Sequence, residues 1–297
     1  MLNRVRFGRA GLEVSRLGLG CVGLGTANKH EDWDPFSADG RRQAIRTVHC
    51  ALDAGINYFD TAPAYGDGHS ESVVGEALQG ARDRAIIATK VSYGGCSAAE
   101  VRQSIHDSLR RLRTDYVDVL QLHGGNYSEK ARRHIFDHGL FDVLCELQTK
   151  GCVRFLGFTV NDPVTAREMI RHESFAVIQL MYNFIEQAAA RHALEWARSA
   201  DMGVTVMRPL TAGTLPLLLQ TLAPSWAERE DIFEMALKFV LSDSRVDMVN
   251  VGMRWEHEVL RNVELVSNYS PALDVANLPR SVGQFSRRGF QLAQHGS

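Results

Sequence analysis

Four polar side chains at or after the ends of short apolar runs have the types needed to transfer a proton to an oxygen atom. Asp60, Lys90 and His123 each end or follow one of three successive apolar runs, and Tyr65 lies in the polar stretch after the first. A phenol titrates near 10 and needs help at neutral pH. An ammonium group stabilises the phenolate, an aspartate holds the ammonium, and a histidine orients a carbonyl oxygen. The set indicates protonation of an oxygen that gains negative charge, as when a carbonyl accepts hydride.

The same reasoning predicts that Lys90 lowers the pKa of Tyr65. Bringing that pKa to about 7 or 8 requires roughly 3 to 4 kcal/mol of differential interaction. Any one of these residues alone is better explained as part of a rim salt bridge or as the polar end of a strand. Together, at successive strand ends, the four favour a catalytic site.

A repeated alternation of apolar runs and amphipathic segments must position these side chains. Because eight such units follow one another without a Ser/Pro-rich linker, the sequence predicts an α/β fold, a single (β/α)8 barrel domain over residues 1–297. A hairpin at about residues 5–16 precedes it, and a tail at about residues 268–297 is expected to cover one end. The expected strands are residues 17–19, 58–60, 85–89, 117–122, 153–157, 177–179, 204–207 and 248–251, and the expected helices are residues 41–54, 70–78, 98–112, 141–150, 163–171, 189–200, 232–242 and 256–266.

Composition excludes several classes of protein. Among 297 residues, 33 Lys and Arg oppose 35 Asp and Glu, which argues against a nucleic-acid-binding protein. The apolar runs are too short to span a bilayer, and we expect no secretory signal, because the N-terminal residues contain no apolar segment of the required length. Five cysteines without a Cys-x-x-Cys pair suit reduced thiols in a cytoplasmic enzyme. A small-molecule substrate is therefore expected, and the oligomeric state stays open.

Several blocks around the four polar residues resemble signatures of the aldo-keto reductase family. They are residues 55–66 (GINYFDTAPAYG), 88–90 (ATK), 108–112 (SLRRL) and 115–123 (DYVDVLQLH), within a similarity from about residue 2 to about residue 266. The resemblance implies a barrel that binds an extended nicotinamide cofactor without a Rossmann fold. It also implies that Tyr65 is the general acid and base, that Lys90 and Asp60 lower its pKa, and that His123 aligns the carbonyl.

The resemblance assigns cofactor contacts less uniformly. Gln179 matches the residue that binds the nicotinamide carboxamide, and Thr159 matches the usual serine beside it. Val160 stands where asparagine is expected, with Asn161 one place later. Met207 stands where many members place the tyrosine that stacks on nicotinamide, so a polarizable sulfur replaces an aromatic face.

At the other end of the cofactor, Arg254 resembles the residue that meets the 2′-phosphate of the adenosine. A bidentate pair with that phosphate favours NADP, with NAD as the alternative. The remaining cofactor-binding residues implied by the resemblance are Arg208, Pro209, Leu210, Gly252, Glu258 and Asn262.

Other motifs are weaker. The glycines of residues 18–23 (GLGCVG) satisfy the dinucleotide-binding pattern, but a polar loop with proline follows instead of the helix that a Rossmann fold requires. His134 and His138 have a zinc-chelating spacing without a third ligand, so no metal is expected.

Three aromatic residues of the rim loops have two open interpretations. Trp33, Tyr93 and Tyr127 either line a substrate pocket or anchor their own loops.

The leading hypothesis is an NADP-dependent oxidoreductase that transfers hydride between nicotinamide C4 and the carbonyl or alcohol carbon of an aldehyde, ketone or sugar. Sequence does not choose the direction or the substrate. The alternative is a cofactor-sensing regulatory subunit, like the family-related β subunits of potassium channels, which keeps the fold but has little turnover.

Overall fold

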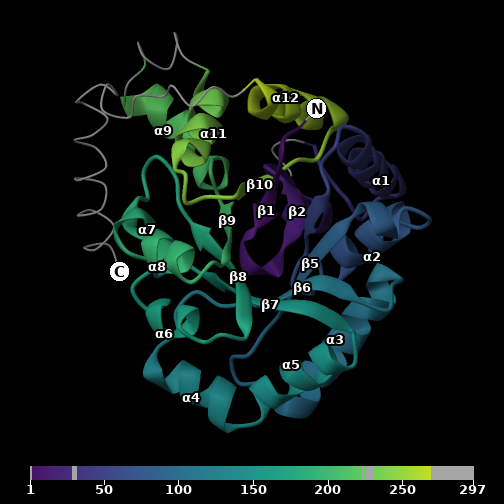
Figure 1. The fold of residues 1–297 in the computed structure, drawn as a ribbon. Helices are drawn as coiled ribbons and strands as arrows, with labels where there is room; N and C mark the ends of the chain where they lie inside the picture. Colours follow the sequence, from purple (N-terminus) through teal and green to yellow (C-terminus); the bar gives the residue numbers. More distant parts are fainter. Residues whose placement is uncertain (1, 29–31, 223, 225–230, 269–297) are drawn as a thin grey trace.

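A closed barrel of parallel strands forms the centre of the computed structural model, which describes residues 2–28, 32–222, 224 and 231–268. The strands lie around the barrel in the order β10-β3-β4-β5-β6-β7-β8-β9 (Figure 1). The barrel closes where its last strand, β10, pairs with its first, β3. This confirms the predicted (β/α)8 fold. The barrel strands are β3 (Leu17–Gly20), β4 (Tyr58–Asp60), β5 (Ile86–Val91), β6 (Val117–Leu122), β7 (Val153–Val160), β8 (Phe175–Met181), β9 (Gly203–Met207) and β10 (Met248–Gly252).

An antiparallel hairpin of β1 (Arg4–Phe7) and β2 (Leu12–Ser15) lies over the N-terminal end of the barrel, and Figure 1 looks onto it. The fully buried ring of Phe7 contacts the edge of Tyr58 inside the barrel, with 5.7 Å between ring centroids. A Cβ on Gly203 would lie 2.7 Å from the same ring, so glycine there leaves room for it. The predicted hairpin therefore closes the end of the barrel opposite the carboxyl ends of the strands.

Helices surround the barrel, and local capping explains their ends. Ser97 and Glu100 form a capping box before one of them, and Arg113 ends it in a left-handed conformation. All eight predicted segments contain helices, while the helices over residues 129–137 and 215–222 were not predicted. The helices are α1 (Ala38–Asp53), α2 (His69–Ala77), α3 (Ala98–Leu112), α4 (Glu129–Asp137), α5 (Leu140–Thr149), α6 (Arg167–Ile170), α7 (Ala188–Arg191), α8 (Ala193–Ser199), α9 (Leu215–Leu222), α11 (Ile232–Ser242) and α12 (Glu256–Ser267).

Two predicted helices were wrong in extent. The segment expected to form a helix over residues 163–171 is helical only in α6, because the Asp162 carboxylate accepts a hydrogen bond from the backbone N–H of Val164 and forms a turn instead. The helix expected over residues 189–200 is split at His192, whose φ of −146° is outside the helical range. Of the tail expected to cover the barrel, everything after Asn268 lies outside the described residues.

A buried aspartate ties three barrel elements together at the N-terminal ends of the strands. Asp118 accepts hydrogen bonds from Arg82 at 2.8 Å, from Arg154 at 2.6 Å and from the backbone N–H of Ile87 at 2.9 Å. We expect Asp118→Ala to lower the free energy of unfolding by about 3 kcal/mol, because it leaves a buried N–H and two cations without their acceptor. Chemical denaturation measures this, with the exposed Asp115→Ala as the control. Equal losses in the two variants would contradict it.

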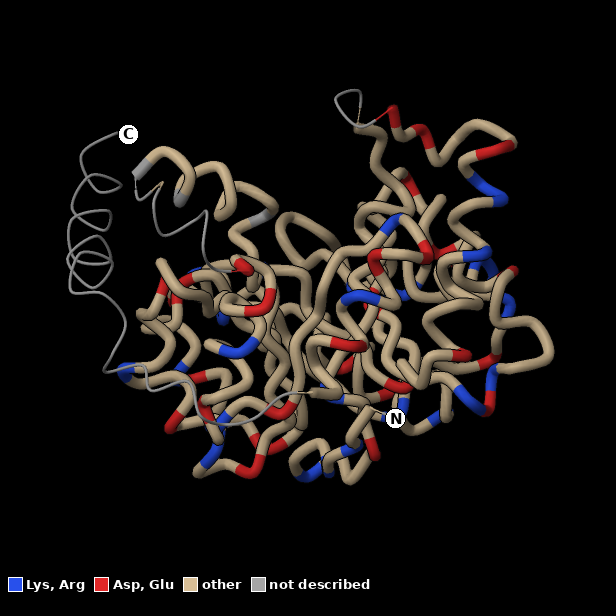
Figure 2. The backbone as a smooth tube through the Cα atoms, turned by 90° about the horizontal axis from the view of Figure 1, so that it is seen from above, with Lys and Arg blue, Asp and Glu red and all other residues tan. Residues whose placement is uncertain are grey.

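Basic and acidic residues are interspersed along the backbone of the described residues (Figure 2). None of the described helices is long and apolar enough to cross a membrane.

Candidate active site

The loop that carries Tyr65 is held in place by a close backbone contact. A Cβ on Gly25 would lie 2.3 Å from the carbonyl oxygen of Tyr65, and a Cβ on Gly66 would lie 2.3 Å from the carbonyl oxygen of Gly25. Gly66 also has a φ of +66°, which disfavours a side chain. Both positions require glycine, so the backbone after β3 fixes the loop after β4.

The four polar residues come together at the carboxyl ends of β4, β5 and β6. Asp60 ends β4, Lys90 lies near the end of β5, and His123 directly follows β6. The ammonium nitrogen of Lys90 lies 4.8 Å from the centroid of the Tyr65 ring. The rings of Tyr65 and His123 meet edge to face, with 6.1 Å between their centroids. The structure thus gathers the set that the strand ends predicted.

Lys90 and Asp60 form a buried ion pair. Nζ of Lys90 donates to both carboxylate oxygens of Asp60 and to the carbonyl oxygen of Thr61, each at 2.8 Å. Burial alone lowers the pKa of Lys90, but the negative charge of Asp60 and the hydrogen-bonding oxygens of Asp60 and Tyr65 outweigh it and raise the pKa to about 12. Lys90 therefore carries a permanent positive charge beside the Tyr65 ring.

Lys90 lowers the pKa of Tyr65 as predicted, but the net shift of that pKa is upward, so the expected net lowering was wrong. Burial raises the pKa of Tyr65 above its usual value, and the opposing effect of the Lys90 ammonium is smaller. Asp60 adds to the rise because it is a second negative charge near the phenol. Tyr65 is accordingly a protonated phenol at neutral pH, which is the form that donates a proton.

His123 is neutral in the same environment. Burial lowers its pKa, and the positive charge of Lys90 lowers it further. Its backbone N–H donates to the carbonyl oxygen of Val91 at 2.8 Å, which continues the pairing of β5 and β6 up to the site. A neutral imidazole next to a phenol can donate a hydrogen bond to a carbonyl oxygen.

Gln179 fits the carboxamide of a nicotinamide cofactor. It lies on β8 with 2% of its surface exposed, and its Nε2 donates to Asp60 at 3.2 Å. Its Oε1 is buried and has no hydrogen-bond partner. A buried acceptor without a donor is costly, and the NH₂ group of a carboxamide would supply the donor.

The neighbouring candidates face the loop that carries His123. The Thr159 hydroxyl donates to the carbonyl oxygen of Gly124 at 2.8 Å and accepts from its N–H at 3.1 Å. A Cβ on Gly125 would lie 2.7 Å from Nδ2 of Asn161, so the Asn161 side chain packs against the same loop. In this structure both residues support the position of His123.

The remaining candidates lie along one side of the barrel mouth. Met207 ends β9 half-buried, and the segment Arg208-Pro209-Leu210 follows it, with Arg208 at a φ of +57°. Gly252 is the exposed last residue of β10. The segment therefore leaves the barrel at the strand end, as the resemblance implied.

The Arg254 side chain packs over the loop after β3, since a Cβ on Gly23 would lie 3.2 Å from its Cγ. Glu258 caps α12 by accepting from the backbone N–H groups of Arg254 at 2.6 Å and Trp255 at 3.2 Å. Asn262 donates to the carbonyl oxygen of Glu258 at 2.9 Å. Glu258 thus caps the helix, Arg254 lies in the segment directly before it, and Asn262 lies in its second turn.

The three rim aromatics are buried, and their polar atoms hold loops. Trp33 donates to the carbonyl oxygen of Gly23, and Tyr93 donates to that of Asn126. The Tyr127 hydroxyl contacts the carbonyl oxygens of Leu122 and Thr159, and its ring stacks on Tyr93. These bonds favour loop anchoring over a substrate-facing role.

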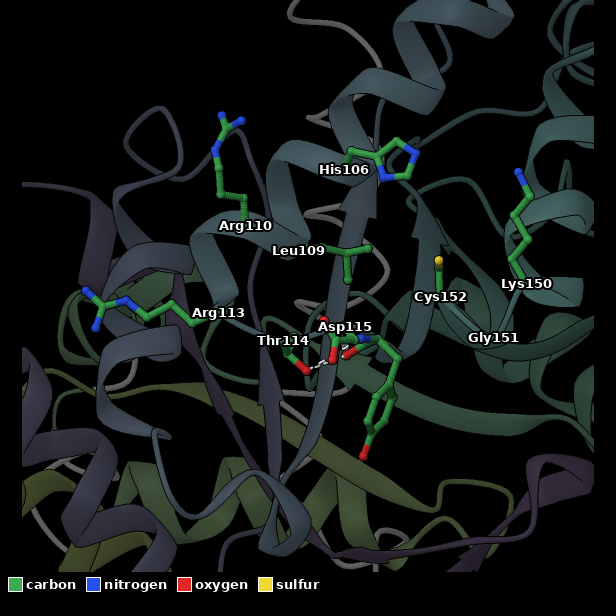
Figure 3. A pocket seen from close by; sticks show the side chains of 10 residues that line it. His106, Leu109, Arg110, Arg113, Thr114, Asp115, Lys150, Gly151 and Cys152 are labelled. Carbon is green, nitrogen blue, oxygen red and sulfur yellow. Dashed lines mark hydrogen bonds between the residues drawn. The ribbon is translucent and has the colours of Figure 1, made fainter.

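The 660 Å³ pocket in Figure 3 is lined by none of the four polar residues. Its walls are the C-terminal ends of α3 and α5 and the segments that precede β6 and β7, so it faces the opposite end of the barrel. Arg110, Arg113 and Lys150 are each bonded to neighbouring side chains of the surface. The pocket contributes nothing to the chemistry at the strand ends.

The glycine motif lies in β3 and the short helix after it, and His134 and His138 lie in α4 and at its end. The glycine pattern of residues 18–23 continues into a short 3-10 helix, Cys21–Gly25, rather than an α-helix, so no Rossmann fold forms there. His134 donates to or accepts from the carbonyl oxygen of Cys96, and no cluster of metal-ligating side chains occurs within the described ranges.

One residue of the site was missed by the sequence reasoning. Gln121 lies on β6 two residues before His123, and its Nε2 donates to Oδ1 of Asp60 at 3.1 Å. The signal was a polar residue inside an otherwise apolar run, at the spacing that puts it on the same face of the strand as His123.

Comparison with known proteins identifies the class. The model of the aldo/keto reductase family matches residues 21–278. The chain belongs to this family. Among curated relatives, the uncharacterized oxidoreductase YqkF of Bacillus subtilis is 28% identical over 72% of this chain and 67% of its own. The NADH-specific methylglyoxal reductase of Escherichia coli is 27% identical over 72% of this chain and 69% of its own.

Solved structures agree with this barrel over almost the whole chain. The holo form of the aldo-keto reductase AKR11C1 from Bacillus halodurans is 27% identical, covers 97% of this chain and 96% of its own, and has a TM-score of 0.75. An aldo/keto reductase from Klebsiella pneumoniae in complex with NADP and acetate is 24% identical, covers 97% and 95%, and has a TM-score of 0.74. At 24% identity, the likeness to the Klebsiella protein shows a shared fold only.

Proposed function

We propose that this protein is an NADP-dependent oxidoreductase that interconverts a carbonyl and an alcohol. The observation that carries the proposal is the buried Lys90–Asp60 pair beside the ring of Tyr65, with neutral His123 at its edge. A nicotinamide, when bound, supplies or accepts the hydride at its C4 atom. The substrate class is an aldehyde, ketone or sugar.

The side chains of the site handle the proton. Tyr65 carries the proton at neutral pH and gives it to the carbonyl oxygen as that oxygen gains negative charge. The charge of Lys90 stabilises the phenolate that remains, and Asp60 holds Lys90 in place. His123 donates a hydrogen bond that orients the substrate oxygen. In alcohol oxidation the same phenolate acts as the base.

The buried Oε1 of Gln179 supports a carboxamide at this position, and Arg254 at the start of α12 supports a 2′-phosphate. The NADP complex of the Klebsiella protein agrees with a preference for NADP over NAD. The NADH-specific relative from Escherichia coli shows that membership of the family does not by itself decide between the two cofactors. Within the proposal, the chain forms one domain, and its free cysteines suit the reducing cytoplasm.

The direct test measures consumption of NADPH and NADH with a panel of aldehydes, ketones and sugars, and formation of NADPH from NADP⁺ with alcohols and sugars. Turnover with at least one carbonyl supports the proposal. Saturable cofactor binding without turnover in either direction would instead support the regulatory-subunit alternative.

The raised pKa of Tyr65 and the lowered pKa of His123 predict a pH dependence. Carbonyl reduction needs protonated Tyr65, so its kcat/KM should stay level across neutral pH and fall only on the alkaline side. Alcohol oxidation needs the phenolate, so its kcat/KM should rise with pH over the same alkaline range. Because the pKa of His123 is below its usual value, acid should reduce activity only below pH 6.5. A reduction rate that falls between pH 7 and 8 would contradict this.

Arg254→Ala should weaken NADPH binding by about 10- to 100-fold, because it removes charge-assisted hydrogen bonds to a phosphate. Binding of NADH, which lacks that phosphate, should change little. Quenching of tryptophan fluorescence measures both. Arg261→Ala is the control, since Arg261 is an exposed arginine of α12 whose guanidinium is bonded to Asp231. An equal loss for both cofactors would contradict the assigned role.

A further inference from the structure

The carboxylate of Asp60 is held by more than its lysine. Oδ1 accepts from Lys90 at 2.8 Å and from Nε2 of Gln121 at 3.1 Å. Oδ2 accepts from Lys90 at 2.8 Å and from Nε2 of Gln179 at 3.2 Å. One glutamine amide therefore lies on each oxygen, and the four hydrogen bonds leave the carboxylate little freedom to rotate.

Gln121 reaches this position because of its place in the barrel. It pairs with Lys90 on β5 and with Gly157 on β7, and its side chain is fully buried. A Cβ on Gly157 would lie 3.3 Å from Cγ of Gln121 and 2.8 Å from the carbonyl oxygen of Val177. Glycine at residue 157 thus leaves the space that the Gln121 side chain occupies.

Packing and stability do not explain a glutamine here. Oε1 of Gln121 is buried and has no hydrogen-bond partner. An unpaired buried carbonyl oxygen is destabilising, so an unbranched apolar side chain of the same size would suit the core better. What the glutamine contributes is the hydrogen bond from its Nε2 to Asp60.

We propose that Gln121 is a positioning residue that acts through Asp60 to keep Lys90 fixed beside Tyr65 and to reduce how far the carboxylate offsets the positive charge of Lys90 at the phenol. This inference rests on the proposed role of Tyr65 as the proton donor and acceptor. The hydrogen bond from Gln121 to Oδ1 draws electron density from the Asp60 carboxylate. The negative charge of Asp60 then offsets less of the positive charge of Lys90 at the Tyr65 oxygen. The groups that face Tyr65 are Lys90 and Asp60, with Cys21 after β3 and His123 after β6.

Gln121→Met tests the proposal because it keeps the shape and removes the donor. Weaker stabilisation of the phenolate should move the alkaline rise of alcohol oxidation upward by about half to one pH unit. The melting temperature should stay the same or rise, and the dissociation constant for NADPH should change less than about twofold. Gln103→Met is the matched control, because Gln103 donates to Asp107 at the same distance, 3.1 Å, on an exposed face of α3. It should leave the pH profile unmoved.

A folded Gln121→Met protein with the wild-type pH profile would overturn the proposal. If its melting temperature were also lower, the role of Gln121 would be structural. If Gln121→Met does not fold, Gln121→Glu replaces it, and its second carboxylate beside Asp60 should shift the profile further upward. If the wild-type protein has no turnover, the proposed function fails separately. The Cζ resonance of Tyr65 in ¹³C-tyrosine NMR, assigned by its loss in Tyr65→Phe, then reports the same upward shift or its absence.

Discussion

Tyr65→Phe should lower kcat for carbonyl reduction by about 10²- to 10⁴-fold, the usual contribution of a positioned proton donor. The substitution removes only the hydroxyl. The phenylalanine ring can keep the edge-to-face contact with His123 and the position beside the Lys90 ammonium. The dissociation constant for NADPH should therefore remain within about twofold of the wild-type value. Stopped-flow measurement of NADPH oxidation, with a separate fluorescence titration of NADPH, distinguishes loss of chemistry from loss of binding.

The matched control is Tyr116→Phe, because Tyr116 lies at the opposite end of the barrel under the guanidinium of Arg82. It loses the same atom outside the site, and its turnover should be unchanged. Wild-type turnover in Tyr65→Phe would show that another group supplies the proton and would end the proposed mechanism. A large loss of NADPH affinity would instead place the hydroxyl in cofactor binding.

The barrel and the four polar residues could be predicted because both depend on local patterns. Alternating apolar runs and amphipathic segments identify the strand–helix units, and the carboxyl ends of parallel strands meet at one end of a barrel. Asp60, Lys90 and His123 fall at three successive strand ends, so their proximity follows from order along the chain. Tyr65 required more, because its loop is placed by the contact between Gly25 and Gly66.

The features that could not be predicted depend on how deeply a side chain is buried and on which hydrogen-bond partners it has in the folded chain. Spacing shows that a cation lies near Tyr65 but gives no measure of how far the phenol is buried, and burial decides the direction of the pKa shift. Thr159 matches a cofactor contact by position, yet its hydroxyl is bonded to the loop at Gly124. Gln121 is a polar residue in a mainly apolar strand, and its role appears only once Asp60 of another strand lies beside it.

Lys90→Met should both destabilise the protein and lower turnover, and the two effects have separable causes. The variant leaves the buried Asp60 carboxylate without its cation, which should lower the free energy of unfolding by about 3 to 5 kcal/mol. It also removes the charge that stabilises the Tyr65 phenolate, so kcat should fall by about 10²-fold or more. Lys150→Met, at a surface lysine bonded to Glu146, should change neither quantity measurably.

The double variant Asp60→Asn with Lys90→Met decides between a structural and a catalytic role for this pair. Removing both charges together avoids an unpaired buried ion, so most of the lost stability should return. A neutral side chain at residue 90 still offers the Tyr65 phenolate no charge, so turnover should stay low. Denaturation curves and kcat measured on the same preparations separate the two roles. Recovery of both stability and turnover would mean that the ion pair only holds the strands together, because proton transfer by Tyr65 would then not need the charge of Lys90.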